Sequence, residues 1–502
     1  MPLKTNFSFQ KSRVFFQIWG ILFVAAFLIR LPIFLSNNFN FDGDEAVIGI
    51  MAQQLLNGTH FPIYFFGQHY GFSTFEVIST AIFELFLGPS VWSLRLGGLL
   101  LFSFGLAFVY FALKRQQVSA FYRWLLLLLL LTFPTWMHWG MRMRGGYLTA
   151  FTFTCLLYYQ FTKMEKNHLS WLLIGVVAGI IFESHTFILI GIFPIFCYWF
   201  FCHKFSYKSL IYGVLGVFSM IALIHFMGSF SAEIWGGPKP DFGWTQQMER
   251  LQHSLSLLVE GFGDFFYYEI AIPIPKWWYW LLVVFLVLSV FYVGFRLFRA
   301  KGKQALALAL TLGIIAIYCF LVSIIRTTSP RYWLGLFTSF EFGLLYLLAK
   351  HWNEKLTRFF LGAFTFISVL GISVGSYFRT TWYFRDVNEL QAFSEFHQAV
   401  EKTGAKAIFI TDGLLQWKWN YLYGEEIPAS CFYKRERIGS YQQRVWRIYQ
   451  KTPKKVIIGG LDGMFFNMDT LPGFNDTRYA VGKKYAINTD ADSRYIDFAM
   501  EK

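Results

Sequence analysis

Residues 38–62 read NFNFDGDEAVIGIMAQQLLNGTHFP and place three carboxylates directly after an apolar run at 14–35. From Asp44 onward, apolar side chains recur at three- and four-residue spacing, which is the period of a helix. They are Val47, Ile48, Met51, Leu55 and Leu56. Asn57-Gly58 supplies a stop signal. The pattern predicts a short amphipathic helix on the outer membrane surface, with Asp42 or Asp44 capping its first turn.

Three acidic residues stand at the start of this helix: Asp42, Asp44 and Glu45. A helix cap requires only one of them, so capping alone does not account for the cluster. Carboxylates that are packed together repel one another and raise each other's pKa values, which favours the handling of a proton. The residues by themselves leave both interpretations open, a cap or a reaction site.

The composition is that of a polytopic membrane protein. Of the 502 residues, 55% are hydrophobic, 21% are aromatic and only 15% are charged, whereas soluble domains are about 25% charged. Runs of the roughly 20 apolar residues that a helix needs to cross the hydrocarbon core recur along the chain. We place spans at 14–35, 91–112, 122–139, 145–161, 170–183, 185–201, 209–227, 277–296, 304–325, 332–349 and 359–377.

Three of these spans need comment. The first has basic flanking residues but no small-residue cleavage site after it, so we interpret it as a retained anchor. The pair within 170–201 is either two short helices or one interrupted helix, because Glu183, Ser184 and His185 break the apolar run. The apolar segment 75–87 is too short to span and is expected to lie in the interface.

The net charge of +14 is mainly a topology signal. Lys and Arg gather in short loops, and the positive-inside rule places those loops and the N-terminus in the cytoplasm of an inner (plasma) membrane protein. Segments 36–90 and 228–275 and the tail then fall outside. No basic–aromatic module for nucleic acid appears, and the five cysteines form no disulfide framework.

The tail, residues 378–502, differs in character from the membrane part at 1–377. Residues 389–413 predict a helix, a turn at Gly404 and a strand that ends at Asp412, and KKVIIGGLDG predicts a second strand. An extracytoplasmic α/β domain is therefore expected. Asp412 and Asp462 follow these strands, where α/β ligand sites often lie, but a turn-making role is favoured for both.

Several segments together resemble GT-C-fold glycosyltransferases. FDGDEAVIGIMAQQLLNGTHFP, GQHYGFSTFE and LGPSVWSLRLGGLL are similar to the first outer loop of the superfamily of protein O-mannosyltransferases and aminoarabinose–lipid A transferases (ArnT-like), with its Asp-Glu pair after the first span. MRMRGGYL (141–148) and SPRYWLGLF (329–337) resemble later segments of bacterial members. The resemblance implies transfer of a sugar from a polyprenyl-phosphate carrier at the outer membrane face, with 36–90 as the catalytic loop.

This chain departs from the aminoarabinose-transferase pattern in two places. GQHYGFS replaces a Lys-Pro-Pro-like turn, and the later lysine-bearing loop has no clear counterpart. The departures leave the sugar, which would be a hexose or a pentose, and the acceptor open.

The resemblance implies roles for the three acids. Asp44 would be the base, within hydrogen-bond reach of the acceptor nucleophile. Glu45 would orient it or bind acceptor, and Asp42 is a second candidate that would contact substrate. The leaving polyprenyl phosphate is already a weak base, so it needs cations near its oxygen rather than a general acid. Direct displacement predicts inversion at the anomeric carbon.

Two segments supply candidate ligands for the donor phosphate. Arg142 and Arg144 lie on the outer side, against the positive-inside trend, and a guanidinium fork fits phosphate; anchoring to lipid head groups is the alternative. Because residues two apart diverge on a helix, we expect an irregular segment before Gly145-Gly146. Arg331 and Tyr332 begin a span at the same outer level, where phosphate binding or interfacial anchoring would suit them.

Four more residues are candidate substrate ligands. His69 and Tyr70 lie on the loop after the acidic helix, where solvation alone is the alternative. Glu183 and His185 are energetically unfavourable in an apolar stretch unless they are paired or hydrated. We therefore expect them to line a cavity or to satisfy each other. The clustered carboxylates are compatible with a divalent metal, but no ligand spacing specifies one, so neither a metal nor a cofactor is expected. The expected partners are a polyprenyl-phosphate-linked sugar donor, a lipid, glycan or protein acceptor, and membrane lipids.

Three other classes of protein compete with this interpretation. A lipid or polysaccharide transporter would also have many spans, although no internal repeat supports it. A ligase that uses a polyprenyl-diphosphate oligosaccharide would have a similar outer cavity. A non-catalytic assembly subunit should tolerate the loss of Asp44.

Overall fold

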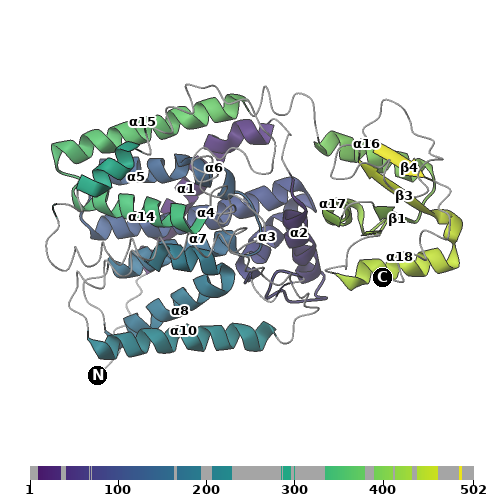
Figure 1. The fold of residues 1–502 in the computed structure, drawn as a ribbon, viewed down its shortest axis with the longest axis horizontal. Helices are drawn as coiled ribbons and strands as arrows, with labels where there is room; N and C mark the ends of the chain where they lie inside the picture. The colour runs from purple at the N-terminus through teal and green to yellow at the C-terminus, as the bar shows by residue number, and fades with distance from the viewer. Residues whose placement is uncertain are drawn as a thin grey trace, which may run out of the picture.

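The structure of the chain is a computed structural model (Figure 1). It describes residues 9–35, 41–66, 68, 71–162, 167–193, 206–228, 284, 287–295, 299, 334–378, 389–410, 413–431, 438–461 and 485–488. The span predicted at 304–325 lies outside these residues, and only part of the span predicted at 277–296 lies within them, where 287–295 are helical.

The N-terminal part is a bundle of apolar helices (Figure 1). Within the described residues, Ser12–Pro32, Val91–Arg115 and Tyr207–Gly228 are long and apolar enough to cross a membrane, by length and composition. They coincide with three of the predicted spans, while the total of eleven stays a prediction. The helices are α1 (Phe9–Leu35), α4 (Val91–Arg115), α5 (Ala120–Thr132), α6 (Pro134–Trp139), α7 (Tyr147–Phe161), α8 (His168–Ser184), α10 (Tyr207–Gly228), α14 (Leu334–Lys350) and α15 (Lys355–Phe378).

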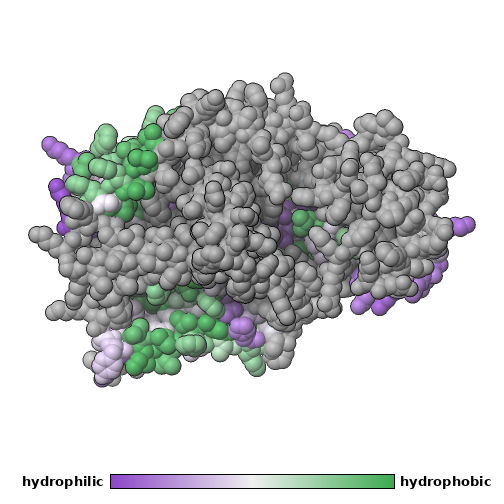
Figure 2. Space-filling view, in the orientation of Figure 1, coloured by the Kyte–Doolittle hydropathy of each residue, from purple (hydrophilic) through white to green (hydrophobic). Residues whose placement is uncertain are grey.

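The outward face of α10 is apolar along its length. Phe218 and Phe226 are about two thirds exposed, at 66% and 65%, and neighbouring Leu, Ile and Val side chains are also exposed. Figure 2 shows this surface in green at the lower edge of the molecule. An apolar surface of this extent is unfavourable in water, and it indicates contact with membrane lipid.

The span predicted at 122–139 is not one helix, which corrects the sequence prediction. α5 ends at Thr132, Phe133 is extended (φ −61°, ψ 128°), and α6 begins at Pro134. Proline disfavours the helical conformation of the residue before it and lacks the N–H that would continue the ladder. The chain then leaves α6 and runs through an irregular segment to α7.

Arg30 of α1 holds this break together. Its guanidinium is fully buried and donates to the carbonyl oxygens of Trp136 at 2.8 Å and Met137 at 3.0 Å. A third bond reaches the Ala26 carbonyl in its own helix at 3.1 Å. A buried arginine that donates to carbonyls of both α1 and α6 ties the two helices together and fixes where the next segment begins.

The break predicted within 170–201 is present. α8 ends at Ser184, and His185 is extended at φ −160° and ψ 96° before helical residues resume at 186–193. α8 packs so closely on α10 that a Cβ added at Gly175 would lie 1.9 Å from the Gly213 carbonyl oxygen. Small residues of this kind let two membrane helices approach backbone to backbone.

The helix predicted from Asp44 is present, but the prediction that it lies exposed on a surface is wrong. α2 (Gly43–Leu56) is buried from Gly43 to Ala52, apart from the partly exposed Asp44. It lies between α3 (Thr74–Leu87) and α17 (Gly413–Tyr423) of the tail (Figure 1). The face opposite the apolar stripe carries Ala46 and Gly49, and a Cβ at Gly49 would lie 2.2 Å from the Tyr421 ring. These small residues admit the tail, which covers the face that was expected to meet water.

The described part of the tail is an α/β structure around one sheet. Its elements are α16 (Glu389–Lys402), β1 (Ala407–Ile410), α17, β2 (Ala429–Cys431), α18 (Gly439–Lys451), the 3-10 turn η3 (Pro453–Lys455), β3 (Val456–Leu461) and β4 (Tyr485–Asn488). The strand order is β2-β1-β3-β4. β1 is parallel to both neighbours, pairing Ile408 with Ala429 and with Ile457, and β4 is antiparallel to β3.

Helices cover both faces of this sheet. Phe393, Phe396 and Trp419 from α16 and α17 pack on the face that carries Ile408 and Ile410. Val445 of α18 packs on the other face. Strand side chains alternate between faces, so β1 contributes to both cores. The predicted helix, turn and strand before 411 are present, with Gly404 at φ +69°; Asp412 and Asp462 lie outside the described residues, and the domain boundary at 378 stays a prediction.

Tyr421 joins the tail to the membrane part. Its hydroxyl donates to Glu84 Oε1 at 2.8 Å and accepts from the Ser90 N–H at 2.9 Å. Gln53 Nε2 of α2 donates to the Tyr421 carbonyl at 3.0 Å. Burial raises the pKa of Glu84 to about 8, against the opposing effect of the Tyr421 hydrogen bond.

The raised pKa of Glu84 gives a pH dependence of stability. Because the folded state holds a proton that the unfolded carboxyl releases near its ordinary value of 4.5, stability is lost as pH rises through about 8. Between about pH 4.5 and pH 8, we expect the free energy of unfolding of the wild type to fall by up to about 1.4 kcal/mol per pH unit relative to Glu84→Gln. Unfolding midpoints of both proteins from pH 5 to 9 test this, and a constant difference between them would contradict it.

Candidate active site

Asp42 and Glu45 together cap the N-terminus of α2. The Asp42 carboxylate accepts from the Asp44 N–H at 3.1 Å, and the Glu45 carboxylate accepts from the Asp42 N–H, also at 3.1 Å. This reciprocal arrangement is a capping box, which satisfies two backbone donors at the helix start. The capping interpretation is therefore correct for these two acids.

Glu45 also forms a buried ion pair with Arg95 of α4. The two side chains are 1% and 2% exposed, and Arg95 Nη1 lies 2.6 Å from Glu45 Oε1. Arg95 donates in addition to the Met141 carbonyl at 3.3 Å. Burial raises the pKa of Glu45, while the charges of Arg95 and Arg142 act in the opposite direction. The pair ties α2 to α4 and to the segment that carries Arg142 and Arg144.

Arg144 bridges the other two acids. Its Nη1 lies 2.9 Å from Asp42 Oδ2, and its Nη2 and Nε lie 2.9 Å and 3.1 Å from Asp44 Oδ2. Asp44 is 15% exposed, whereas Asp42 is 4% and Arg144 3% exposed. Of the three acids that the sequence singled out, Asp44 is thus the one whose carboxylate reaches the surface of the cluster.

These residues form one ion-pair cluster of Asp42, Asp44, Glu45, Arg95, Arg142 and Arg144. Arg142 is fully buried and acts electrostatically on both Glu45 and Arg95. Three carboxylates face three guanidinium groups, so the formal charge of the cluster is 3 − 3 = 0. Like charges still lie near one another, since the charge of Asp42 raises the pKa of Glu45, but the nearby guanidinium groups oppose this effect.

Glu76 of α3, which was not among the residues predicted from the sequence, positions the arginine segment. Its buried Oε1 accepts from the N–H groups of Leu148 at 2.9 Å and Thr149 at 3.2 Å, at the N-terminus of α7. Burial raises its pKa to about 7. A carboxylate in an otherwise apolar helix was the signal that could have found it, since such a group needs a buried partner.

The turn between Arg144 and α7 depends on glycine. Gly145 and Gly146 have φ of +66° and +97°, a region that side chains rarely adopt. A Cβ at Gly146 would also lie 2.4 Å from the Ser184 carbonyl oxygen. Residues 142–144 are irregular, as predicted from the spacing of the two arginines.

Glu183 lies across this turn, with partners other than His185. Its carboxylate accepts from the Tyr64 hydroxyl at 3.1 Å and pairs with His225 Nε2 at 3.2 Å. The His185 ring instead packs against the Tyr147 ring, with centroids 4.1 Å apart. Glu183 and His185 therefore do not satisfy each other, which was one of the two predicted alternatives. Tyr64 and His225 were not predicted as partners, because they come from distant segments of the chain.

Lys418 brings a cation from the tail toward the acidic helix. It lies on α17, is only 7% exposed, and places its Nζ 5.9 Å from the centroid of the Phe41 ring, next to Asp42 in the chain. No sequence signal connects residue 418 with residue 41. His69, Tyr70, Arg331 and Tyr332, which the sequence also indicated, lie outside the described residues.

Comparison with known proteins identifies the fold. No family model matches the chain, and no curated protein matches it in sequence. Solved structures that match include ArnT from Cupriavidus metallidurans bound to undecaprenyl phosphate, with a TM-score of 0.57 at 12% identity, over 94% of this chain and 97% of that one. The apo state of ArnT gives a TM-score of 0.58 at 13% identity and the same coverage. The resemblance to ArnT-like proteins inferred from the sequence is confirmed at the level of the GT-C fold.

Proposed function

We propose that this chain is a membrane glycosyltransferase that moves a sugar from a polyprenyl-phosphate carrier to an acceptor at the outer membrane face, with inversion. The fold is shared with ArnT, which has been crystallised with undecaprenyl phosphate. The observation that carries the proposal is the partly exposed Asp44 carboxylate, held by Arg144 beside two buried acids. A base needs such a position, fixed by its partners yet within reach of an acceptor.

In the proposed reaction, Asp44 takes the proton from the acceptor hydroxyl or amine as that atom attacks the anomeric carbon. The bond from the anomeric carbon to the phosphate oxygen breaks, and the electron pair leaves with polyprenyl phosphate. Protonation of Asp44 removes one negative charge beside Arg144 while negative charge grows on the phosphate. The guanidinium of Arg144 can then act on the leaving group, where a preorganised cation stabilises the transition state.

The charge balance of the cluster implies that further cations serve the donor. Three acids already match three arginines among the described residues, and a phosphate adds at least one more negative charge. We propose that Lys418 and Arg331 supply the additional positive charge that the phosphate needs. Arg142 and Arg144 are the proposed phosphate ligands within the cluster itself. Glu183, His185, His69, Tyr70 and Tyr332 are retained as proposed substrate contacts.

Incubation of the purified chain with a polyprenyl-phosphate sugar and extracted acceptor tests the proposal. We expect acceptor-dependent release of free polyprenyl phosphate, measured by mass spectrometry. Release only from a diphosphate-linked oligosaccharide would identify a ligase, and movement of the lipid across vesicles without release would identify a transporter. Mass spectrometry of lipid that co-purifies with the chain would name the sugar and the carrier length.

The donor cations can be tested separately from the base. Arg331→Ala and Lys418→Met are each expected to lower kcat/KM for the donor by roughly 10- to 100-fold, the range of a lost hydrogen bond to a charged group. The KM for the acceptor should change little. Lys350→Ala, at the C-terminal end of α14, is the control. Donor kinetics equal to the control in both variants would remove Arg331 and Lys418 from the site.

A further inference from the structure

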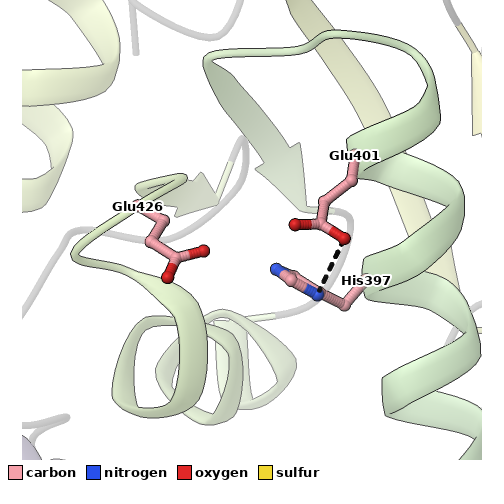
Figure 3. A group of neighbouring side chains, drawn as sticks. All are labelled: His397, Glu401 and Glu426. Carbon is pink, nitrogen blue, oxygen red and sulfur yellow. Dashed lines mark ion pairs between the residues drawn. The ribbon is translucent and has the colours of Figure 1, made fainter.

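A histidine and two glutamates meet in the tail, outside the ion-pair cluster. His397 and Glu401 lie one turn apart on α16, and Glu426 follows the end of α17. Residues four apart share a face of a helix, so the first two point the same way. Figure 3 shows the Glu426 carboxylate directed toward them from the neighbouring segment.

One ligand atom from each residue lies within 4.8 Å of the others. His397 Nδ1 is 3.8 Å from Glu401 Oε2. The second ring nitrogen, Nε2, is buried and has no hydrogen-bond partner among the described residues. In Figure 3 this nitrogen lies on the side of the ring that faces Glu426. A buried nitrogen without a partner is unfavourable, unless something else occupies the space between these groups.

Aromatic side chains fix the imidazole in this orientation. The Tyr423 ring stacks on it with centroids 3.8 Å apart and an interplanar angle of 15°, and the Trp419 ring lies 5.6 Å away. The histidine is only 13% exposed, whereas Glu401 is 52% exposed. One ligand is therefore held in place while the carboxylates are free to adjust, which is an arrangement that can close around an ion.

We propose that His397, Glu401 and Glu426 bind a divalent transition-metal ion of the Zn²⁺ class. Imidazole nitrogen and carboxylate oxygen are both ligands of zinc, and water can take the fourth position when the protein supplies three. Tetrahedral bonds of about 2.0–2.2 Å need ligand atoms roughly 3.3–3.6 Å apart, so rotation of the exposed glutamates has to shorten the present separations. The imidazole disfavours Mg²⁺ and Ca²⁺, which prefer oxygen ligands.

Such an ion would connect α16 to the end of α17. α17 also carries Tyr421, which packs on Gly49 of α2 and bonds to Glu84. The bound ion would thus stabilise the helix that covers α2. The sequence offered no metal-ligand spacing, because the third ligand lies 25 residues beyond Glu401 and joins the pair only in the folded chain.

Zinc binding by the full-length chain in detergent, after removal of its purification tag and treatment with chelator, tests the proposal. We expect a site for one Zn²⁺ by calorimetry, a higher unfolding midpoint with Zn²⁺, and no such increase with Mg²⁺ or Ca²⁺. Glu426→Gln, at an exposed position, should weaken binding at least about tenfold and abolish the increase.

The matched control is Glu354→Gln. Glu354 pairs with His351 at 2.7 Å on another part of the chain, so the change removes a carboxylate from a similar pair but leaves the proposed site intact. Its zinc affinity should equal that of the wild type. Equal affinity of Glu426→Gln and the wild type, or an absence of binding by the wild type, would overturn the proposal.

Discussion

Asp44→Asn is expected to lower the rate of sugar transfer by about 10²- to 10⁴-fold, the usual contribution of a general base. Asparagine keeps the size of the residue but cannot take the acceptor proton. The measurement is acceptor-dependent release of polyprenyl phosphate under saturating donor. The unfolding midpoint should change little, because Arg144 keeps Asp42 as a partner.

Asp42→Asn is the matched comparison for this prediction. Asn is as good an N-cap as Asp, so α2 should keep its start, and Asp42 is 4% exposed against 15% for Asp44. We expect a clearly smaller loss of transfer than in Asp44→Asn. A larger loss in Asp42→Asn would move the base to residue 42, and full turnover in Asp44→Asn would reject the proposed base.

Glu45→Gln is expected to have the largest effect on stability. It leaves Arg95 buried without its anionic partner at 2.6 Å, and breaking a buried pair from one side costs about 3–5 kcal/mol. The capping contact to the Asp42 N–H can persist through the amide oxygen, so the loss reports mainly on the charge. Unfolding of the purified chain by SDS titration or by heat measures it.

Two further variants make this prediction specific. The double change Glu45→Leu with Arg95→Met removes both charges, and we expect it to regain much of the stability, because apolar replacement of a buried pair is often close to neutral. Arg115→Met, at the exposed end of the same helix α4, removes hydrogen bonds to Tyr159 that are open to water and should cost less than about 1.5 kcal/mol. A Glu45→Gln effect no larger than that of Arg115→Met would contradict the importance of the pair.

Local features of the fold could be predicted from the sequence. Composition identified a membrane protein, and helical spacing with Asn57-Gly58 located α2 nearly to its ends. Chain breaks before Gly145-Gly146 and at His185 were also predicted, as were the helix, turn and strand of the tail. These features depend on hydrogen bonds and steric limits within one or two turns of chain, so nearby residues contain the information.

The candidate site was predicted only in part. The sequence indicated Asp42, Asp44, Glu45, Arg142 and Arg144, and the structure brings all five into one cluster. Which acid pairs with which base was not predictable, and Arg95 was not recognised at all. Glu76 was missed as well, although it caps α7 from a helix 72 positions earlier in the chain.

Composition, apolar spacing and turn residues were enough to predict a membrane protein, the local course of its helices and the acidic start of α2. Tertiary structure alone decided that α2 is covered by the tail, that Glu45 faces Arg95 and that Tyr421 meets Glu84, 337 positions away in the chain. The spacing of apolar or charged residues along the chain describes only one surface of one segment. The partner of that surface depends on how distant segments pack, and in a buried site the packing fixes which charges are paired and which one remains within reach of a substrate.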